Sequence, residues 1–427
     1  MMRNLKISLL ALVVLVVGIV CADNVRVFAS APLALHAAPS VADFSASLDV
    51  KAPVTGTVQV FLPMIARAPV DVRWNFAVVD REYTSVGNIR FSSDMVLDSN
   101  GVPHVAYDVG DGGSMLRYGY LSGDQWIIED VGSTELGAAV SLALSSDDVA
   151  HISYNACNPW YCAPRYAEQI GAGWVITEAV DGQGALAIDS QGNPHLSYTH
   201  GNVVGGVTVR YAYRMGGNWI TTTVAGPADD YRGTTLKLDT SGLAHMTYSE
   251  YTQSPDLYNS SDVTGSLYYT QWSGTAWIIE MIDDDIVDEA SGSHQIGQNS
   301  ALALGVNGSV HIGYYDGDEH SLKYAFRSGS GWVKETVDSV ALATPWTVQY
   351  VALALDADDQ PHLVYFDQGS VKYARRIAGQ WKLETLATDV GDYSELSIAI
   401  GAQNRLHVTY GRYDGQESFL MYGWGEF

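Results

Sequence analysis

The stretch His311-Ile-Gly-Tyr314 is one copy of a phrase, His-(Ile/Val/Leu/Met)-x-Tyr, that occurs seven times in the chain. The other copies begin at His104, His151, His195, His245, His362 and His407. Successive copies start 47 (151 − 104), 44, 50, 66, 51 and 45 residues apart. A period of about 40 to 50 residues is typical of four-stranded propeller blades. The phrase therefore predicts a repeat protein in which one ring of seven blades uses most of the chain. Function is then expected in the segments that differ from one repeat to the next.

Each copy is preceded by an alternating strand and a tight turn. The strand alternates large apolar residues with small or polar ones, as in Met95-Val-Leu-Asp98 and Leu353-Ala-Leu-Asp356, which is the pattern of a closely packed inner strand. The turn ends in a residue type that tolerates a left-handed backbone. These residues are Gly101, Asp148, Gly192, Gly242, Gly308, Asp359 and Asn404. We expect one hairpin geometry in all seven copies.

Aromatic residues mark the third and fourth strands of each repeat. The third-strand aromatics are Tyr118, Tyr166, Tyr211, Tyr268, Tyr324, Tyr373 and Tyr422. The fourth strand opens with Trp126, Trp174, Trp219, Trp277, Trp332 and Trp381. Four of these tryptophans are followed three residues later by an acid, at Glu129, Glu280, Glu335 and Glu384.

The last repeat ends without a fourth strand. The segment Trp74 to Asp80 reproduces the Trp-x-x-x-x-Val-Asp ending of Trp332 to Asp338. We therefore expect residues 71–80 to complete the last blade and close the ring, because closure covers both faces of every blade. The predicted fold is all-β, a seven-bladed β-propeller of four-stranded blades over residues 71–427, with almost no helix.

The N-terminus has the layout of a secretory signal peptide. Arg3 and Lys6 precede an apolar run from Ile7 to Val20, and small residues follow. We expect a signal peptide over residues 1–22 and a linker or stalk over residues 23–70, with an uncleaved anchor as the alternative. This predicts a protein that is secreted or displayed at the cell surface, where the stalk could provide attachment.

Charge and cysteine content narrow the choice of partners. The net charge is −25, and removing residues 1–22 with their two positive charges makes it −27. Such a surface repels phosphate backbones, which argues against nucleic acid, and leaves cations, neutral sugars and basic proteins. Cys157 and Cys162 remain after cleavage and are expected to form a disulfide in an oxidising compartment. We expect a monomer.

Two phrases carry a resemblance to a known group of proteins. Leu353 to Tyr365 (Leu-Ala-Leu-Asp-x-x-x-x-Pro-His-Leu-Val-Tyr) and Leu322 to Ala325 (Leu-Lys-Tyr-Ala) resemble repeats of bacterial exported seven-bladed β-propeller proteins. More loosely, the architecture is similar to that of the sialidase-like propellers. The resemblance implies the fold but no activity, because propellers host binding modules and enzymes alike. The sequence lacks the sialidase Asp-box, Ser-x-Asp-x-Gly-x-x-Trp, and an early Arg-Ile-Pro motif.

Insertions indicate which face of the ring carries function. Connections between the first and second and between the third and fourth strands are short, and they lie on one face. The other face receives the long connections, which are 155–163, 199–206, 249–266 and 283–299. Because binding residues concentrate on variable loops of a rigid scaffold, this long-loop face is the candidate site.

Polar and aromatic residues on the long-loop face are the candidate ligand contacts. Trp160 and Tyr161, between the two cysteines, could stack on a sugar, although they could equally cover the disulfide or a neighbouring blade. The remaining candidates are Arg165, His200, Asp229, Tyr231, Arg232, His294, Asp316, Asp318 and Glu319. The acidic run Asp283, Asp284, Asp285 and Asp288 could bind calcium, or be a solvated surface.

These observations favour a binding module over an enzyme. The seven repeat histidines are predicted to be structural, because an active site is normally singular. Our leading hypothesis is an exported propeller that recognises a carbohydrate or an extracellular protein, with calcium as the candidate cofactor. One alternative is a glycan-active hydrolase or lyase that uses carboxylates of the region 283–319. Another is a scaffold that docks proteins.

Overall fold

In the computed structural model of the chain, the described residues form a β-propeller. They are 72–83, 92–109, 114–135, 140–157, 162–180, 182, 184–202, 205–228, 230–252, 264–284, 300–317, 319–329, 331–340, 350–388, 390 and 395–427. The predicted signal peptide and stalk lie outside these residues, and so do the boundaries at residues 22 and 70. Among the described residues no helix is long and apolar enough to cross a membrane.

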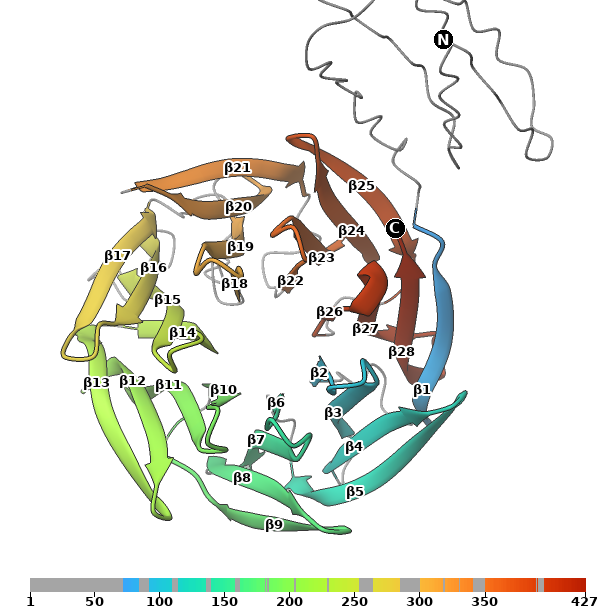
Figure 1. Ribbon diagram of the computed structural model, residues 1–427, viewed down its shortest axis with the longest axis horizontal. Coiled ribbons are helices and arrows are strands. Elements are labelled where there is room, and N and C mark those ends of the chain that lie inside the picture. The colour runs from blue at the N-terminus through green and yellow to red at the C-terminus, as the bar shows by residue number, and fades with distance from the viewer. Residues whose placement is uncertain are drawn as a thin grey trace, which may run out of the picture. The chain divides into compact units, whose positions relative to one another are not determined.

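Seven four-stranded antiparallel sheets follow one another around a ring (Figure 1). Blades 1 and 2 contain β2 (Ser93–Leu97), β3 (Pro103–Val109), β4 (Ser114–Ser122), β5 (Gln125–Glu135), β6 (Val140–Leu144), β7 (Ala150–Cys157), β8 (Cys162–Ile170) and β9 (Gly173–Glu178). Blades 3 and 4 contain β10 (Gly184–Ile188), β11 (Pro194–Asn202), β12 (Gly206–Met215), β13 (Asn218–Ala228), β14 (Asp230–Leu238), β15 (Ala244–Thr252), β16 (Thr264–Trp272) and β17 (Trp277–Asp283).

The remaining strands complete the ring. Blades 5 and 6 contain β18 (Ala301–Leu304), β19 (Val310–Asp316), β20 (Ser321–Ser328), β21 (Gly331–Ser339), β22 (Val351–Leu355), β23 (Pro361–Asp367), β24 (Ser370–Ile377) and β25 (Gln380–Ala387). Blade 7 contains β26 (Ser397–Gly401), β27 (Arg405–Tyr413), β28 (Glu417–Glu426) and β1 (Asn75–Tyr83). The one described helix is a 3₁₀ turn, η1 (Ala402–Asn404). The all-β class, the seven blades and the near absence of helix are as predicted.

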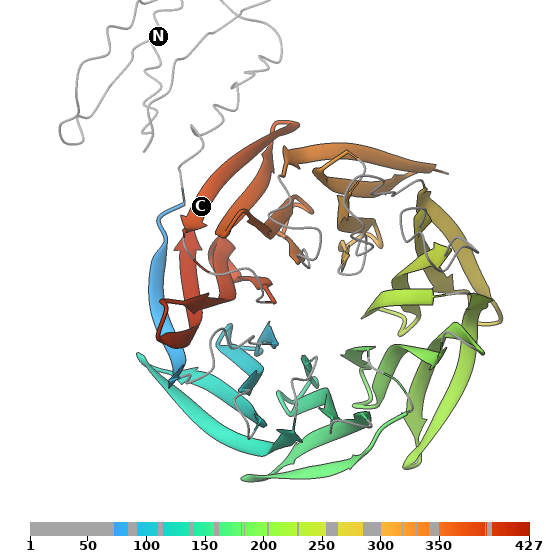
Figure 2. The ribbon, with the colours of Figure 1, turned by 180° about the vertical axis from the view of Figure 1, so that it is seen from behind.

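The N-terminal strand closes the ring, as predicted. β1 pairs antiparallel with β28 as the outermost strand of blade 7, so the first and last strands of the propeller lie side by side (Figures 1 and 2). It also contacts both neighbouring blades. The Trp74 indole N–H donates to Glu384 of blade 6 at 3.3 Å, and the Tyr107 hydroxyl of blade 1 donates to Asp80 at 2.6 Å.

The hydrophobic core is divided among the junctions between blades. The buried apolar residues of the described part form seven clusters, and each cluster joins the facing sheets of two adjacent blades. Inner-strand residues such as Leu142 and Leu302, each 3% exposed, belong to these clusters. A blade therefore buries its two faces only because it has a neighbour on each side.

The inner turns have the left-handed backbone that their residue types predict. Residues 101, 148, 192, 242, 308, 359 and 404 have φ between 56° and 83°. In blade 1 the Asp98 carboxylate accepts hydrogen bonds from the backbone N–H groups of Asn100 and Val102 at 2.9 and 2.7 Å. Asp148, at the left-handed position of blade 2, also accepts from the Ser99 backbone N–H at 2.9 Å, and so links two neighbouring turns.

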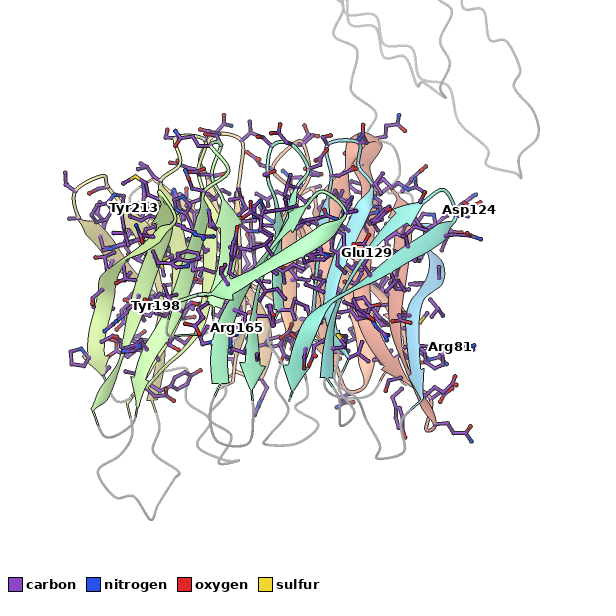
Figure 3. The ribbon with its side chains drawn as sticks, turned by 90° about the horizontal axis from the view of Figure 1, so that it is seen from below. Arg81, Asp124, Glu129, Arg165, Tyr198 and Tyr213 are labelled. Atoms are coloured by element: carbon purple, nitrogen blue, oxygen red, sulfur yellow. The ribbon has the colours of Figure 1, made fainter. Side chains whose placement is uncertain are left out.

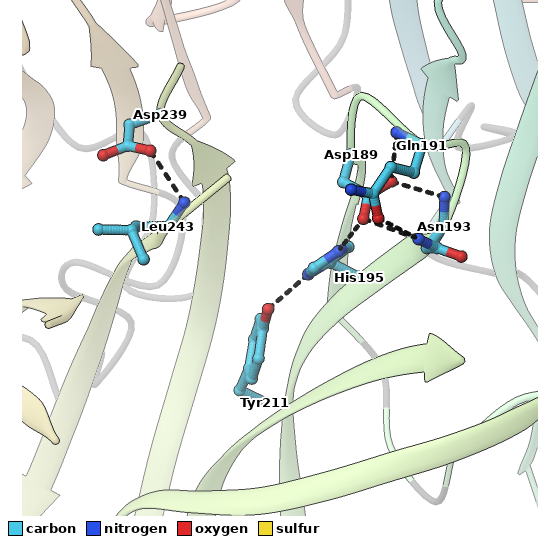
Figure 4. A network of polar contacts seen from close by, with 7 residues as sticks. All are labelled: Asp189, Gln191, Asn193, His195, Tyr211, Asp239 and Leu243. Carbon is cyan, nitrogen blue, oxygen red and sulfur yellow. Dashed lines mark hydrogen bonds and ion pairs between the residues drawn. The ribbon is translucent and has the colours of Figure 1, made fainter. Parts of the chain in front are cut away.

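The repeat histidines are structural, as predicted. In every blade the histidine Nδ1 meets the hydroxyl of a third-strand tyrosine, as for His195 and Tyr211 in Figure 4, and the contact measures 2.5 to 2.7 Å in five blades. In blade 3 the other nitrogen, Nε2, lies 3.4 Å from the Asp189 carboxylate. A carboxylate only accepts, so Nε2 carries the proton and Nδ1 accepts from the tyrosine.

One third-strand assignment is wrong. His245 of blade 4 bonds to Tyr269 at 2.7 Å, and not to Tyr268. The register explains the difference, because Tyr268 pairs with Tyr248 just as Lys323 pairs with Tyr314 in blade 5. Tyr268 therefore occupies the position that is Arg or Lys in five other blades.

The fourth-strand tryptophans join each blade to the preceding one. Each indole packs edge-on against the third-strand tyrosine of the preceding blade, with ring centroids 5.1 to 5.8 Å apart. At four junctions the indole N–H also donates to a glutamate of the preceding blade, as from Trp332 to Glu280 at 3.1 Å. This contact gives the sequence spacing Trp-x-x-Glu its role.

Removing β1 should unfold the ring, because blade 7 would lose its outer strand and blades 6 and 1 would lose their contacts with it. We expect a variant that begins after Tyr83 to aggregate or to melt well below the chain that begins at Asp71, as followed by far-ultraviolet circular dichroism. Equal melting temperatures for the two variants would contradict the role of β1 in closure.

Acid should destabilise the propeller through its buried histidines. Burial lowers the pKa of His151 and His407 to about 4, from an ordinary value of 6.5. The unfolded chain therefore takes up protons first, and stability present above pH 6.5 is lost as the pH falls towards 4. Urea unfolding at half-unit pH steps should show this decline, with a shallower slope in His407→Gln. A free energy of unfolding that stays constant from pH 6.5 to 4.5 would contradict it.

Candidate functional site

The strand directions place the candidate site at one end of the blades. Asp124, in the short turn between β4 and β5, lies at the upper end in Figure 3, whereas Arg165 and Tyr198 lie towards the lower end. The lower end is where second strands lead into third strands, and it is the predicted long-loop face. Two predicted insertions are partly strand, because β11 pairs with β12 as far as Asn202 and β15 pairs with β16 as far as Thr252.

Several predicted site residues lie outside the described part of the chain. They are Trp160, Tyr161, Asp229, His294, Asp318, Asp285 and Asp288. The side chains of Cys157, Cys162 and Arg232 are also outside it. The backbones of the two cysteines are direct cross-strand neighbours in the β7–β8 pair. The disulfide, the aromatic loop and the calcium site remain predictions.

The described carboxylates of the 283–319 region are held by lysines. Asp283 is buried and accepts from the Tyr314 hydroxyl at 2.7 Å and from Lys334 Nζ at 2.5 Å. Lys323 bridges Asp316 and Glu319, and its nitrogen lies 3.0 Å from the Glu319 carboxylate. Asp284 is exposed at the end of β17. Three of these four acids are thus engaged in ion pairs.

The contact between Asp283 and Tyr314 recurs at two other junctions. Asp338 of blade 5 accepts from Tyr365 of blade 6 at 2.7 Å and from Lys372 at 3.0 Å. At the closing junction Asp80 accepts from Tyr107 at 2.6 Å, and Arg117 lies 2.8 Å from the same carboxylate. An aspartate from one blade therefore binds the repeat tyrosine of the next. These acids hold blades together and are not free to act on a ligand.

Tyr231 and His200 differ in their access to a ligand. Tyr231 is 5% exposed and packs edge-on against Tyr248, with ring centroids 5.5 Å apart, so it belongs to the core. Burial raises the pKa of its hydroxyl. His200 is half-buried near the end of β11, and its carbonyl accepts from the Thr208 hydroxyl at 3.0 Å. Of the two, only His200 lies at the rim of the long-loop face.

A small crevice opens at the junction between blades 2 and 3. It is lined by ten residues, among them Tyr154, Asn155 and Arg165 from blade 2 and Tyr198 from blade 3. Its free volume is about 10 Å³, which is room for about one water molecule and not for a sugar ring. Arg165, one of the lining residues, has a side chain that is 31% exposed.

Carboxylates that sequence reasoning passed over gather at the junction between blades 7 and 1. The Asp94 carboxylate accepts from the Met95 and Leu142 backbone N–H groups at 2.8 and 2.9 Å and from the Ser397 hydroxyl at 3.2 Å, so it joins three blades. Glu395 accepts from the Ser92 hydroxyl at 2.7 Å. The sequence did mark Asp94 as unusual, because the six other blades have Ser, Thr or Ala at the equivalent position.

Burial and nearby charge shift the protonation of this pair. Desolvation, together with the charges of Asp94 and Asp108, raises the pKa of Glu395 to about 8. Burial also raises the pKa of Asp94, against the hydrogen bonds that it accepts. Glu395 is therefore protonated at neutral pH. Among the described residues no three His, Cys, Asp or Glu side chains are arranged to hold a metal ion.

Comparison with known proteins adds to the evidence for the fold. No protein-family model matches the chain, and no curated protein matches it in sequence. The PL25 ulvan lyase, a polysaccharide lyase, superposes with a TM-score of 0.55 at 12% identity over 77% of this chain and 91% of its own. The polysaccharide lyase Uly1 gives 0.51 at 10% identity, over 80% and 91%. The Aleuria aurantia lectin gives 0.46 at 15% identity, over 70% and 96%. The superpositions on the two lyases establish similarity of fold alone.

Glu395 should make the ring less stable in mild alkali. Its pKa in the folded state is raised to about 8 from 4.5, so the folded state holds a proton that the unfolded state has lost, and stability falls as the pH rises to about 8. Glu395→Gln keeps an acceptor for Ser92 without the charge. We expect this variant to exceed the parent in free energy of unfolding at pH 8.5 by about 2 to 4 kcal/mol, and to match it near pH 5.

The exposed Glu426→Gln provides the control, because it removes one carboxylate away from the junction. Parallel pH profiles for the parent, Glu395→Gln and Glu426→Gln would show that Glu395 is ionised in the folded state and would contradict the assignment.

Proposed function

We propose that this chain is an exported binding module that recognises carbohydrate with its long-loop face. The observation that carries the proposal is the state of the carboxylates on that face. Asp283, Asp316 and Glu319 are bound to lysines, whereas Arg165, on β8, has a side chain that is 31% exposed and Asp284 is exposed at the end of β17. Preformed polar groups of this kind orient a ligand by hydrogen bonds without a deep pocket.

Proteins of the same fold support the choice of ligand class. The PL25 ulvan lyase has also been solved with a saccharide bound, and it superposes over most of this propeller. Two of the superposable structures act on polysaccharides. A protein of similar fold therefore binds a saccharide, which supports this ligand class. The signal peptide proposed for residues 1–22 would bring the domain to an extracellular polysaccharide, and residues 23–70 would tether it at a surface.

Glu395 is the observation that favours the second candidate, a glycan-active enzyme. A carboxyl with a pKa of about 8 is protonated at neutral pH and could act as a general acid. Against this, Glu395 is bound to Ser92 within the blade 7–blade 1 junction, and the 283–319 carboxylates are paired. No described group beside it is a free base. Binding without turnover is the better-supported function.

A glycan array probed with the full chain, with calcium and again with chelator, tests the binding function. We expect selective binding to a family of polysaccharides, and loss of that binding in chelator if the acidic run after β17 holds calcium. The variant Asp284→Asn/Asp285→Asn should reproduce the effect of chelator, whereas Asp124→Asn on the opposite face should have no effect. Binding that is insensitive to chelator and to these variants would reject the calcium site. If no glycan on the array bound the chain, carbohydrate binding would be rejected in favour of a protein-docking scaffold.

A further inference from the structure

A basic residue recurs on the third strand, beside the repeat tyrosine. The register pairs Tyr107 with Arg117, Tyr154 with Arg165, Tyr198 with Arg210, Tyr314 with Lys323 and Tyr365 with Lys372. This position faces the preceding blade, because Arg117 reaches Asp80 across the junction. Five blades thus have an arginine or lysine at the equivalent position of the third strand, towards the long-loop face.

The acids that neutralise this cation are missing at two junctions. Arg117 and Lys372 are paired with the aspartate of the preceding blade, and Lys323 is paired with Asp316 of its own blade. The aspartate stands six residues after the fourth-strand tryptophan, and the corresponding residues before blades 2 and 3 are Gly132 and Val180. Arg165 and Arg210 therefore face junctions without that carboxylate.

The contacts of these two arginines leave guanidinium nitrogens available. Arg165 Nη1 lies 3.3 Å from Glu178, whose side chain is 84% exposed, and exposed pairs of this kind contribute little. Arg210 donates from Nε to the Thr208 hydroxyl at 3.2 Å. No described carboxylate lies within ion-pair distance of Arg210, and no described residue accepts from its two terminal nitrogens.

Blade 3 also departs from the repeat in charge. Residues 184–228 contain one acid, Asp189, and two arginines, Arg210 and Arg214, so the blade has a charge of +1 in a chain of −25. Asp189 lies in the turn at the other face, where the backbone N–H groups of Gln191 and Asn193 bind its carboxylate, each at 2.8 Å. Arg210, nearer the long-loop end, therefore has no acid of blade 3 beside it among the described residues.

We propose that Arg165, at the junction between blades 1 and 2, and Arg210, at the junction between blades 2 and 3, form an anion-binding subsite over two neighbouring junctions of the long-loop face, and that its ligand is an acidic polysaccharide. Guanidinium binds carboxylate and sulfate in a bidentate geometry. Two such groups at the same level of adjacent blades suit a polymer that carries several anionic units, and His200 lies at the same rim. This inference rests on the proposed carbohydrate binding and names the class of carbohydrate.

The acidity of the whole protein makes the inference easy to test. A chain of net charge −25 repels polyanions at long range, so adsorption without a local site is not expected. At physiological ionic strength, salt screens the repulsion between charges that lie more than about 8 Å apart, whereas contacts at shorter range are little affected. Binding of a polyanion at 150 mM salt would therefore report a local basic site.

Affinity electrophoresis and calorimetry of the full chain with three polymers provide the test. Alginate carries carboxylates, dextran sulfate carries sulfates, and dextran carries neither. We expect alginate, dextran sulfate or both to bind and dextran not to bind, which also identifies the anion. Arg165→Gln/Arg210→Gln should weaken binding by about 10- to 100-fold, as for loss of charged hydrogen bonds.

Arg214→Gln is the matched control for the single variant Arg210→Gln, which should also weaken binding. It removes one positive charge from the same strand, β12, but its Nε donates to the Gly217 carbonyl in the turn at the other face, so it should bind as the parent does. Thermal unfolding of each variant shows whether it is folded. Binding that falls equally in both variants, or in neither, would overturn the subsite. Neutral polysaccharides binding as well as acidic ones would overturn it while leaving carbohydrate binding in place, and no binding to any polysaccharide would overturn both.

Discussion

The contact on which this ring depends is a tryptophan packed edge-on against a tyrosine of the preceding blade. It occurs at all seven junctions, with ring centroids 5.1 to 5.8 Å apart. The tyrosine is itself fixed, because its hydroxyl bonds to the repeat histidine of its own blade. Each tryptophan therefore meets a rigid surface, and edge-to-face pairs of this kind contribute about 0.5 to 1.5 kcal/mol beyond the area they bury. The angle between blades is set once and repeated, which is what lets the seventh blade meet the first.

Closure follows from this contact and from the division of the core. Because every apolar cluster lies between two blades, an open ring would leave two sheet faces exposed to water. β1 removes that cost, since it joins β28 in register and brings Trp74 against Tyr373 of blade 6. Its Asp80 then binds Tyr107 of blade 1. A strand that begins the domain is thus held by three blades at once.

The sequence predicted the features that repeat and the closing strand, and missed individual side-chain contacts between blades. The left-handed turn residues and the structural histidines were predictable because they occur once in each of the seven blades. The closing strand was predictable because Trp74 to Asp80 repeats the fourth-strand pattern that the last repeat lacks. The aromatic of blade 4 was misplaced, since Tyr268 and Tyr269 are adjacent and only the strand register distinguishes them. The junction of Asp94 with Ser397 joins residues 303 apart, and no periodicity indicates which side chains meet there. The ion pair between Lys334 and Asp283 was missed for the same reason.

The two junctions of blade 3, with blade 2 and with blade 4, lack acids that join blades elsewhere in the ring. At other junctions a glutamate stands three residues after the fourth-strand tryptophan, or an aspartate six residues after it. At the junction with blade 2 these two positions are Thr177 and Val180, and at the junction with blade 4 they are Thr222 and Ala225. Neither acid is therefore available there to bind the neighbouring blade. The fold does not require a cation at the position of Arg210, because Tyr268 fills it in blade 4 and Met421 in blade 7. A half-buried guanidinium without a carboxylate is a cost to folding that an apolar residue would avoid. Its presence beside a junction that lacks both repeat acids, at Thr177 and Val180, is therefore better explained by a ligand than by the ring.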